Sequence, residues 1–265
     1  MDFSRYTALQ VETADRITTI TINRPEARNA INAELHHEFT RIWPDVDTDP
    51  GTDVIVLQGS GGAFCAGGDL KWLVSIAGDP VKIAQGQRAD RRITDEMLTV
   101  EKPIIAKVDG PAIGLGCSLA LFCDFVYATQ RSMFADPHVS VGLVAGDGGA
   151  LLWPQLVGYA RARRYLLTGD PVPAADAAAM GLITQSVADA AELDAVADAM
   201  ARRMLTGAKH AIQFTKASIN AGLRQVASAV VDRAAAYEGL TMMTEDFRIA
   251  LDAFAAKERP VFKGI

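Results

Sequence analysis

Twice in this chain, an apolar segment runs into a glycine-rich turn that opens a predicted helix. The first turn lies in GGAFCAGGDL, with Gly67 and Gly68, and the second lies in DGPAIGLGCSL, with Gly114 and Gly116. Amides at a helix N-terminus have no internal partner and lie at the positive end of the helix dipole. Two such ends aimed at one point would stabilise a developing oxyanion. Either turn alone can also be structural, and neither matches a P-loop or a GxGxxG nucleotide site.

The order of the predicted elements indicates an α/β fold. Alternating and continuous apolar runs predict strands, and a longer apolar period predicts a first helix. The predicted strands lie at about 7–12, 16–22, 53–58, 104–108 and 124–128, and the helix lies at about 32–46. Strand, turn and helix recur about every 45 residues in the first half, which is the spacing of βαβ units. Beyond about residue 154 the pattern predicts helices, and the Ala-rich segment 190–257 shows no strand signal.

Composition and charge argue against nucleic-acid-binding and membrane-binding functions. The 265 residues are 49% hydrophobic and 22% charged, with a net charge of −6, as in a folded domain. Lysines and arginines are scattered, whereas nucleic acids and membrane surfaces require a concentrated positive face, so neither is expected as a partner. We also find no long apolar run, no secretory signal and no CxxC spacing among three cysteines. We therefore expect a cytoplasmic protein without a metal site.

Five motifs follow one another along nearly the whole chain. They are NRPEARNA from residue 23, AFCAGGDL, KPIIAKVDGPAIGLGCSLALFCDF, LLTGDPVPAADAAAMGLI and the closing RPVFK. In this order they resemble the enoyl-CoA hydratase/isomerase (crotonase) superfamily. The resemblance implies a crotonase-like spiral of repeated ββα units over 1–195, which carries an acyl-CoA site, and a C-terminal helical oligomerisation region over 196–265. It also implies a homotrimer or hexamer, with coenzyme A present only as part of the thioester substrate.

The same resemblance assigns residues to the substrate. The thioester carbonyl is expected between the backbone amides of Gly68 and Leu115, and a backbone donor tolerates any side chain at either position. Arg28 and Lys71 can bind phosphates or be solvated, and Asp69 can instead cap its helix. The residues that match coenzyme A contacts are Ala27, Arg28, Ala66, Asp69, Leu70 and Lys71, with Phe262 and Lys263 at the adenine end, in some members from a neighbouring subunit.

Two positions depart from the hydratase pattern of this family. Such an enzyme holds a water between two glutamates, and the matching residues here are Ser118 and His138. Serine has no useful base strength, and histidine is charged when protonated. Asp147 supplies a carboxylate where the family has a small residue, and we expect it either to cap the following helix or to transfer a proton. His138 is expected to be its acid/base partner or a hydrogen-bonded pocket residue.

Other candidates are expected to be structural. We place His36, His37 and His210 on or near helix surfaces, and we expect Trp72 and the buried aromatic residues to pack the core or to wall the acyl site. Free cysteines are usually small buried apolar residues.

Three functions remain open. The leading one is an acyl-CoA-processing enzyme, enoyl-CoA hydratase-like, that stabilises a thioester enolate in fatty acid or related acyl-CoA catabolism. The alternatives are an enoyl-CoA isomerase or a specialised CoA lyase or hydrolase that uses Asp147 and His138, and a catalytically silent acyl-CoA binder. The position of Asp147 discriminates between them, because a carboxylate in the acyl pocket favours an enzyme and a helix cap favours a binder.

Overall fold

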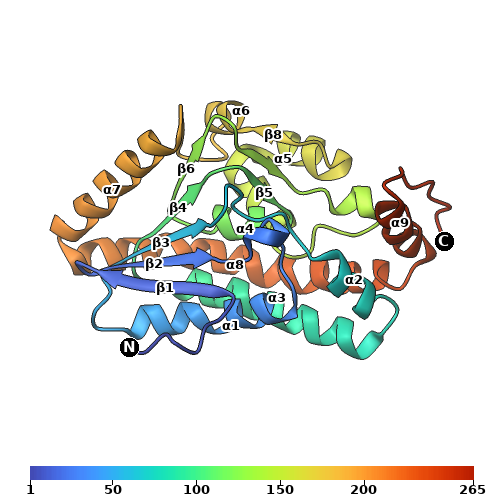
Figure 1. The fold of residues 1–265 in the computed structure, drawn as a ribbon, viewed down its shortest axis with the longest axis horizontal. Coiled ribbons are helices and arrows are strands. Elements are labelled where there is room, and N and C mark those ends of the chain that lie inside the picture. Colours follow the sequence, from blue (N-terminus) through green and yellow to red (C-terminus); the bar gives the residue numbers. More distant parts are fainter.

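A six-stranded sheet forms the centre of the computed structural model, which describes residues 1–265 (Figure 1). Its strands are β1 (Leu9–Ala14), β2 (Ile17–Ile22), β3 (Val54–Gly59), β4 (Ile104–Val108), β6 (Phe125–Thr129) and β9 (Gln185–Val187). They lie in the order β1-β2-β3-β4-β6-β9, and only the β1–β2 pair is antiparallel. In β2 the alternation of the sequence places Ile20 and Ile22 in the core, as period-two patterning requires.

A second, three-stranded sheet gives the fold its repeated ββα units. It consists of β5 (Pro111–Ile113), β7 (Met133–Ala135) and β8 (Val172–Pro173). Strand β4 continues into β5 and then into α4 (Leu115–Leu121), and β6 continues into β7 and then into a 3-10 turn, η2 (His138–Val141), and α5 (Gly149–Thr168). The two sheets thereby bring the starts of α4 and η2 to neighbouring positions, because β5 and β7 pair in parallel.

Helices cover both sides of the large sheet. Figure 1 shows α1 (Ala33–Thr48) and α3 (Pro80–Thr99) along its lower side and α7 (Ala190–Thr206) above it. Helix α8 (Lys209–Thr241) packs on α3. The largest fully buried side chains are Trp43 of α1 and Trp153 of α5. The remaining elements are η1 (Pro25–Ala27), α2 (Leu70–Ile76), α6 (Ala174–Ala179) and α9 (Glu245–Ala256).

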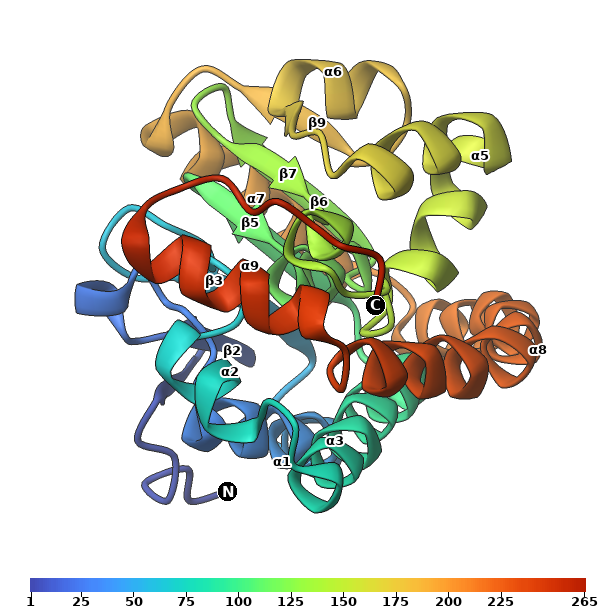
Figure 2. The ribbon, with the colours of Figure 1, turned by 90° about the vertical axis from the view of Figure 1, so that its right-hand side faces the viewer.

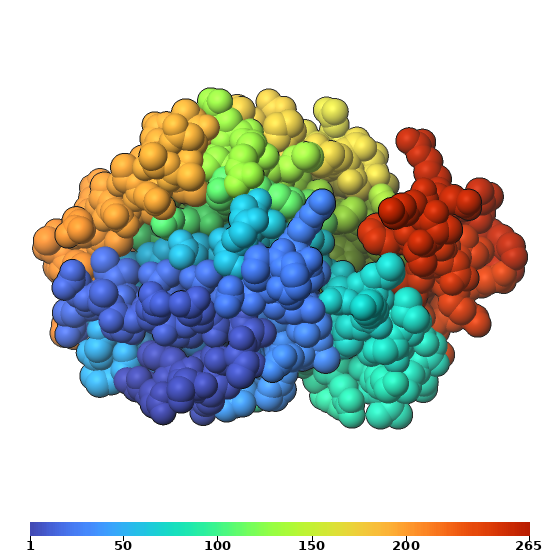
Figure 3. Space-filling model, viewed as in Figure 1, coloured from blue at the N-terminus to red at the C-terminus, as the bar shows by residue number.

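The C-terminal region is part of the same body as the sheets. The expected boundary after residue 195 falls inside α7, whose Leu193, Ala197 and Ala201 pack on residues of the large sheet. Figure 2 shows the C-terminal segment running back along α9, and the carbonyl of Ile265 accepts from the amide of Glu245 at 3.0 Å. In Figure 3 this red lobe lies at one end of the molecule, beside the teal α2–α3 region.

Most predicted elements are found within a few residues of their expected bounds. Helix α1 begins where Asn32 accepts a hydrogen bond from the amide of Leu35 at 2.9 Å, which is the usual role of an N-cap. The sequence did not predict the strands β5, β7, β8 and β9, since two or three residues are too short for a periodic signal. None of the helices combines the length and the hydropathy that a membrane crossing requires.

Candidate active site

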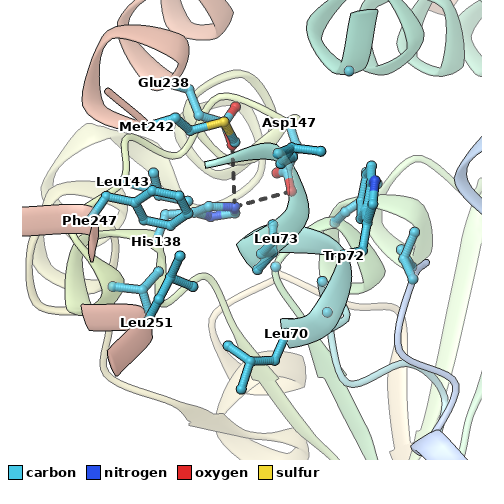
Figure 4. A pocket seen from close by; sticks show the side chains of 18 of the residues that line it. Leu70, Trp72, Leu73, His138, Leu143, Asp147, Glu238, Met242, Phe247 and Leu251 are labelled. Carbon is cyan, nitrogen blue, oxygen red and sulfur yellow. Dashed lines mark ion pairs between the residues drawn. The ribbon is translucent and has the colours of Figure 1, made fainter. Parts of the chain in front are cut away.

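A cavity of about 220 Å³ opens between the two glycine turns and the C-terminal helices (Figure 4). Most of its lining is apolar, and the side chains that form this part come from α2, the segment after η2, and α9. They include Leu70, Leu73, Leu143, Phe247 and Leu251. The cavity therefore offers an apolar chain a place to bind, as small-molecule sites generally do.

The two glycine turns meet at one wall of this cavity. The amide of Cys65 donates to the carbonyl of Pro111, and the amide of Ile113 donates to the carbonyl of Cys65, each at 2.9 Å. A Cβ atom on Gly67 would lie 3.2 Å from the carbonyl oxygen of Ile113, and Gly114 has a φ of 54°. Both positions therefore favour glycine, because close backbone approach or positive φ disfavours side chains.

Gly68 and Leu115 follow these contacts and both line the cavity. Leu115 is the first residue of α4, so its amide has no carbonyl partner within the helix. Neither the amide of Gly68 nor that of Leu115 donates to another group of the protein. Two unpaired amides thus border one cavity, as the resemblance predicts for an oxyanion hole.

Asp147 points into the cavity and does not cap a helix. The N-cap residue of α5 is Gly148, and no side chain caps that helix, so the capping prediction for Asp147 is wrong. The buried carboxylate accepts from Ser118 Oγ at 3.2 Å and lies 3.3 Å from Nε2 of His138. Gly148 has a φ of 133°, and a Cβ there would lie 2.9 Å from Ser118, so glycine permits this close packing.

His138 lies between two carboxylates. Its Nδ1 is 2.5 Å from the buried Asp136, and its Nε2 faces Asp147. Burial alone would lower the pKa of His138, but the carboxylates of Asp147 and Asp136 outweigh burial and raise this pKa well above its usual value. Both ring nitrogens of His138 are therefore directed at acids, and these acids favour its protonated form.

Glu238 of α8 completes this group, and sequence reasoning missed it. Its side chain is buried, and Oε1 lies 3.9 Å from Nε2 of His138. Burial raises the pKa of Glu238 well above its usual value, the charge of His138 opposes this shift, and the charge of Asp147 adds to it. A Cβ on Gly146 would collide with this carboxylate, so glycine at that position leaves room for the acid. The available signal was one acid in the apolar run AAAYEGLTMM.

A pair of residues from α1 and α3 also lines the cavity. The prediction of a surface position is wrong for His36, which is buried, with Nε2 2.6 Å from Oδ1 of Asp90. Its ring lies 4.8 Å from that of Trp72, which also lines the cavity. His37 and His210 are exposed, as expected. The cavity therefore contains two His–carboxylate pairs rather than one.

The residues expected to bind coenzyme A are spread around the cavity. Ala66 and Leu70 line it, whereas Arg28 and Lys71 are exposed and do not. Asp69 caps α2, accepting from the amide of Lys71 at 3.0 Å, and its carboxylate pairs with an arginine, Arg24, at 3.2 Å. The three remaining candidates, which also lie outside the lining, are Ala27, Phe262 and Lys263.

The acidic group also has the composition of a metal site, although the sequence spacing predicted none. Ligand atoms of Asp136, His138 and Asp147 all lie within 4.8 Å of one another. Asp136 and Asp147 face opposite ring nitrogens of His138, so the three side chains are already paired with one another.

Known proteins are similar to this chain in both sequence and fold. The family model for enoyl-CoA hydratase/isomerase matches residues 12–265. The chain is 32% identical to a crotonyl-CoA hydratase of Syntrophomonas wolfei, over 97% of this chain and 98% of that protein. It is also 32% identical to a short-chain-enoyl-CoA hydratase of Clostridium acetobutylicum, over 94% and 95%.

A solved structure gives the same result. An enoyl-CoA hydratase/isomerase from Mycobacterium paratuberculosis superimposes with a TM-score of 0.89 at 37% identity, over 93% of this chain and 98% of that chain. The fold, the two paired glycine turns and these matches lead to one conclusion. The chain belongs to the enoyl-CoA hydratase/isomerase family.

Proposed function

We propose that the protein adds water to the double bond of a 2-enoyl-CoA, with Asp147 as the base and Glu238 as the acid. One observation supports this proposal above all: both carboxylates line the cavity that the free amides of Gly68 and Leu115 border. Two acids with separated roles can thus replace the two missing glutamates. The family matches support an acyl-CoA substrate.

The chemistry follows from where charge develops. Asp147 removes a proton from water as its oxygen bonds to the β-carbon, and the π electrons move onto the thioester oxygen. The amides of Gly68 and Leu115 stabilise this enolate, and the loss of one such donor typically costs about 3 kcal/mol of barrier. Glu238 then donates its proton to the α-carbon. After product release, the proton on Asp147 returns to Glu238 by way of His138, which lies next to both.

The assignment of acid and base rests on the electrostatics. Burial raises the pKa of both Asp147 and Glu238, but His138 is in closer contact with Asp147, which opposes the rise there. We therefore assign the role of base to the carboxylate closer to His138 and the role of acid to the more distant one. Unequal environments of this kind divide acid and base roles between two similar groups.

Coenzyme A would enter along the exposed side of the first glycine turn. Leu70 and Ala66 would contact the chain that leads to the sulfur, since both line the cavity. Two exposed cations lie beside this turn: Arg28, whose carbonyl accepts from the amide of Ala66, and Lys71, which follows Leu70. We assign both to the phosphates. Asp69 would act through its backbone, because its side chain is engaged in the cap of α2. We keep Ala27, Phe262 and Lys263 as contacts of the adenine end.

Two other activities use the same residues. An isomerase needs one base that moves a proton between the α- and γ-carbons, and Asp147 can serve as that base. A CoA lyase or hydrolase would use Asp147 and His138 as acid/base groups in the cleavage of a different bond of the acyl-CoA. A catalytically silent binder is disfavoured, since Asp147 lies in the cavity and caps no helix.

The test is turnover of crotonyl-CoA, followed by the loss of enoyl-thioester absorbance. We expect Asp147→Asn and Glu238→Gln each to lower kcat by about 10²–10⁴-fold, which is the usual contribution of an acid/base group. The dissociation constant for a saturated acyl-CoA should stay within a few-fold of that of the parent.

Matched controls are Asp252→Asn and Glu258→Gln, since both side chains are exposed on or just after α9. They should leave kcat unchanged. If the parent binds acyl-CoA but does not hydrate crotonyl-CoA, the hydratase proposal is wrong. Conversion of a 3-enoyl-CoA into a 2-enoyl-CoA by the same sample would then identify an isomerase.

A further inference from the structure

The pair formed by His36 and Asp90 is not used by the proposed reaction. His36 comes from α1 and Asp90 from α3, and their side chains are 5% and 18% exposed, so both are largely withdrawn from water. Gln87, one turn before Asp90, also lines the cavity and donates from Nε2 to the carbonyl of Ala235. Three polar side chains thus interrupt a wall that is otherwise apolar.

These side chains keep unused hydrogen-bonding capacity. Within the chain, Nδ1 of His36, Oδ2 of Asp90 and Oε1 of Gln87 take part in no hydrogen bond, and none of the three atoms is sealed inside the protein. A hydrocarbon chain against this wall would remove water from the three atoms without replacing its hydrogen bonds, which is unfavourable. A ligand atom that can both accept and donate would satisfy them.

The position of the pair indicates which part of a ligand it meets. The ring of His36 lies 4.8 Å from that of Trp72. In Figure 4, Trp72 lies on the opposite side of Asp147 from His138. An acyl chain that starts at the amides of Gly68 and Leu115 and passes Asp147 toward Trp72 would therefore bring its far end to His36.

We propose that His36, Asp90 and Gln87 form a subsite for an oxygen atom, as a hydroxyl or oxo group, carried by the acyl chain beyond its double bond. The proposal rests on the proposed function, because it takes the chain to be an enoyl thioester. Asp90 accepts from Nε2–H of His36 and outweighs burial in raising the pKa of His36, which favours a proton on Nδ1 as well. This Nδ1–H donates to the ligand oxygen, and Asp90 or Gln87 accepts from a hydroxyl. A distal carboxylate would be repelled by the carboxylates of Asp90 and Asp147, which line the same cavity.

The test compares three substrates of equal chain length: hex-2-enoyl-CoA, 5-oxohex-2-enoyl-CoA and 5-hydroxyhex-2-enoyl-CoA. We expect the parent to prefer at least one of the oxygenated substrates by about tenfold or more in kcat/KM, because unpaired polar groups in a site reject the analogue that lacks the oxygen. His36→Phe and Asp90→Asn should reduce this ratio to near one. His37→Phe is the matched control, since its side chain is exposed on the same helix, and should keep the ratio.

Several outcomes would overturn the subsite. One is equal kcat/KM for the three substrates in the parent, and another is a preference that survives in both variants. An equal loss on all three substrates would show that the pair acts only through the fold or the proton-transferring groups. Asp90→Asn keeps the volume of the side chain and carries the test alone if circular dichroism shows that His36→Phe is unfolded.

A binding measurement separates this proposal from the proposed function. If the parent turns over none of the substrates, titration calorimetry with hexanoyl-CoA and 5-oxohexanoyl-CoA still tests the subsite. About tenfold tighter binding of the oxo compound by the parent, lost in Asp90→Asn, would support the subsite while the hydratase proposal fails. Equal dissociation constants in the parent would sink the subsite.

Discussion

Asp136 influences every titratable member of the acidic group, although it does not line the cavity. One of its oxygens contacts His138, and the other is buried without a hydrogen-bond partner, against Gly149. Its negative charge raises the pKa of His138, of Asp147 and of Glu238. A single residue therefore raises the pKa of the proposed acid Glu238, of the proposed base Asp147 and of His138 between them.

We predict that Asp136→Asn shifts the pH profile of kcat/KM to lower pH on both sides. Loss of a negative charge makes protons leave its neighbours more easily. The pKa of Asp147 falls, so the base stays ionised at lower pH, and the acid limb moves down. The pKa of Glu238 also falls, so the acid loses its proton sooner, and the alkaline limb moves down as well.

The profile is measured on crotonyl-CoA for the parent, the variant and Asp170→Asn, an exposed control. The control should reproduce the parental limbs. Limbs that stay in place in Asp136→Asn, or that move to higher pH, would show that Asp136 does not control the titration of the site.

At the scale of elements, α8 both supplies Glu238 and docks on the large sheet through a buried lysine. Nζ of Lys216 donates to Asp124 Oδ2 at 2.7 Å and to the carbonyl of Lys102 at 2.8 Å. The same helix begins with Lys209, whose exposed ammonium pairs with Asp53. One helix therefore offers a buried and an exposed ion pair for comparison.

We predict that Lys216→Met lowers the free energy of unfolding by about 3 kcal/mol, because removal of one partner strands the other groups of a buried pair. Lys209→Met should cost about 0.5 kcal/mol, as exposed pairs do. Urea denaturation followed by circular dichroism gives both values. Similar losses in the two variants would contradict the role of Lys216 in holding α8 to the sheet.

Local patterns explain which elements the sequence could predict. The alternation in 16–22 and the N-cap at Asn32 depend on residues that are close in sequence, so the sequence alone predicts the strand and the start of the helix. The two free amides were expected from the glycine turns and from the family motifs together. Glu238 and His36 were not, since only the packing of α8, α1 and α3 decides that a polar side chain on a helix faces a cavity.

The sequence predicted the importance of Asp147 but not its role. Its departure from the family motif marked it, but two roles fitted the same glycine-rich turn. A cap and a buried acid differ by the direction of one side chain, and contacts with Ser118 and His138 fix that direction. Ser118 is 29 positions away and His138 belongs to η2, outside the turn, so the turn itself could not reveal the answer.

At the scale of the whole molecule, α8 exposes apolar residues that a monomer would leave in water. Ile219, Tyr237 and Leu240 are 69%, 54% and 64% exposed. Ile219 and Tyr237 are 18 positions apart, which is about five turns, so they share one face of the helix. Such a face is typical of an interaction surface, and the family resemblance suggests further copies of the chain.

We predict a homotrimer, or a hexamer of paired trimers, whose mass in light scattering is three or six times 28.3 kDa. The double variant Ile219→Glu, Leu240→Glu should lower this mass, because buried charges oppose association. Its circular dichroism should match that of the parent. A parent that is monomeric at micromolar concentration would contradict the prediction.

The cavity also has an order of assembly that follows from the direction of translation. Gly68, Leu115, His138 and Asp147 all emerge from the ribosome well before Glu238, which lies in the last turn of α8. The segments that form both sheets and both free amides are therefore synthesised before the proposed proton donor, whereas α8 and α9, which supply part of the cavity lining, come last. The final helices close the cavity and deliver the acid in the same step. A chain that stops before these helices would thus lack both part of the acyl pocket and the acid, and activity would begin only after α8 and α9 have been made.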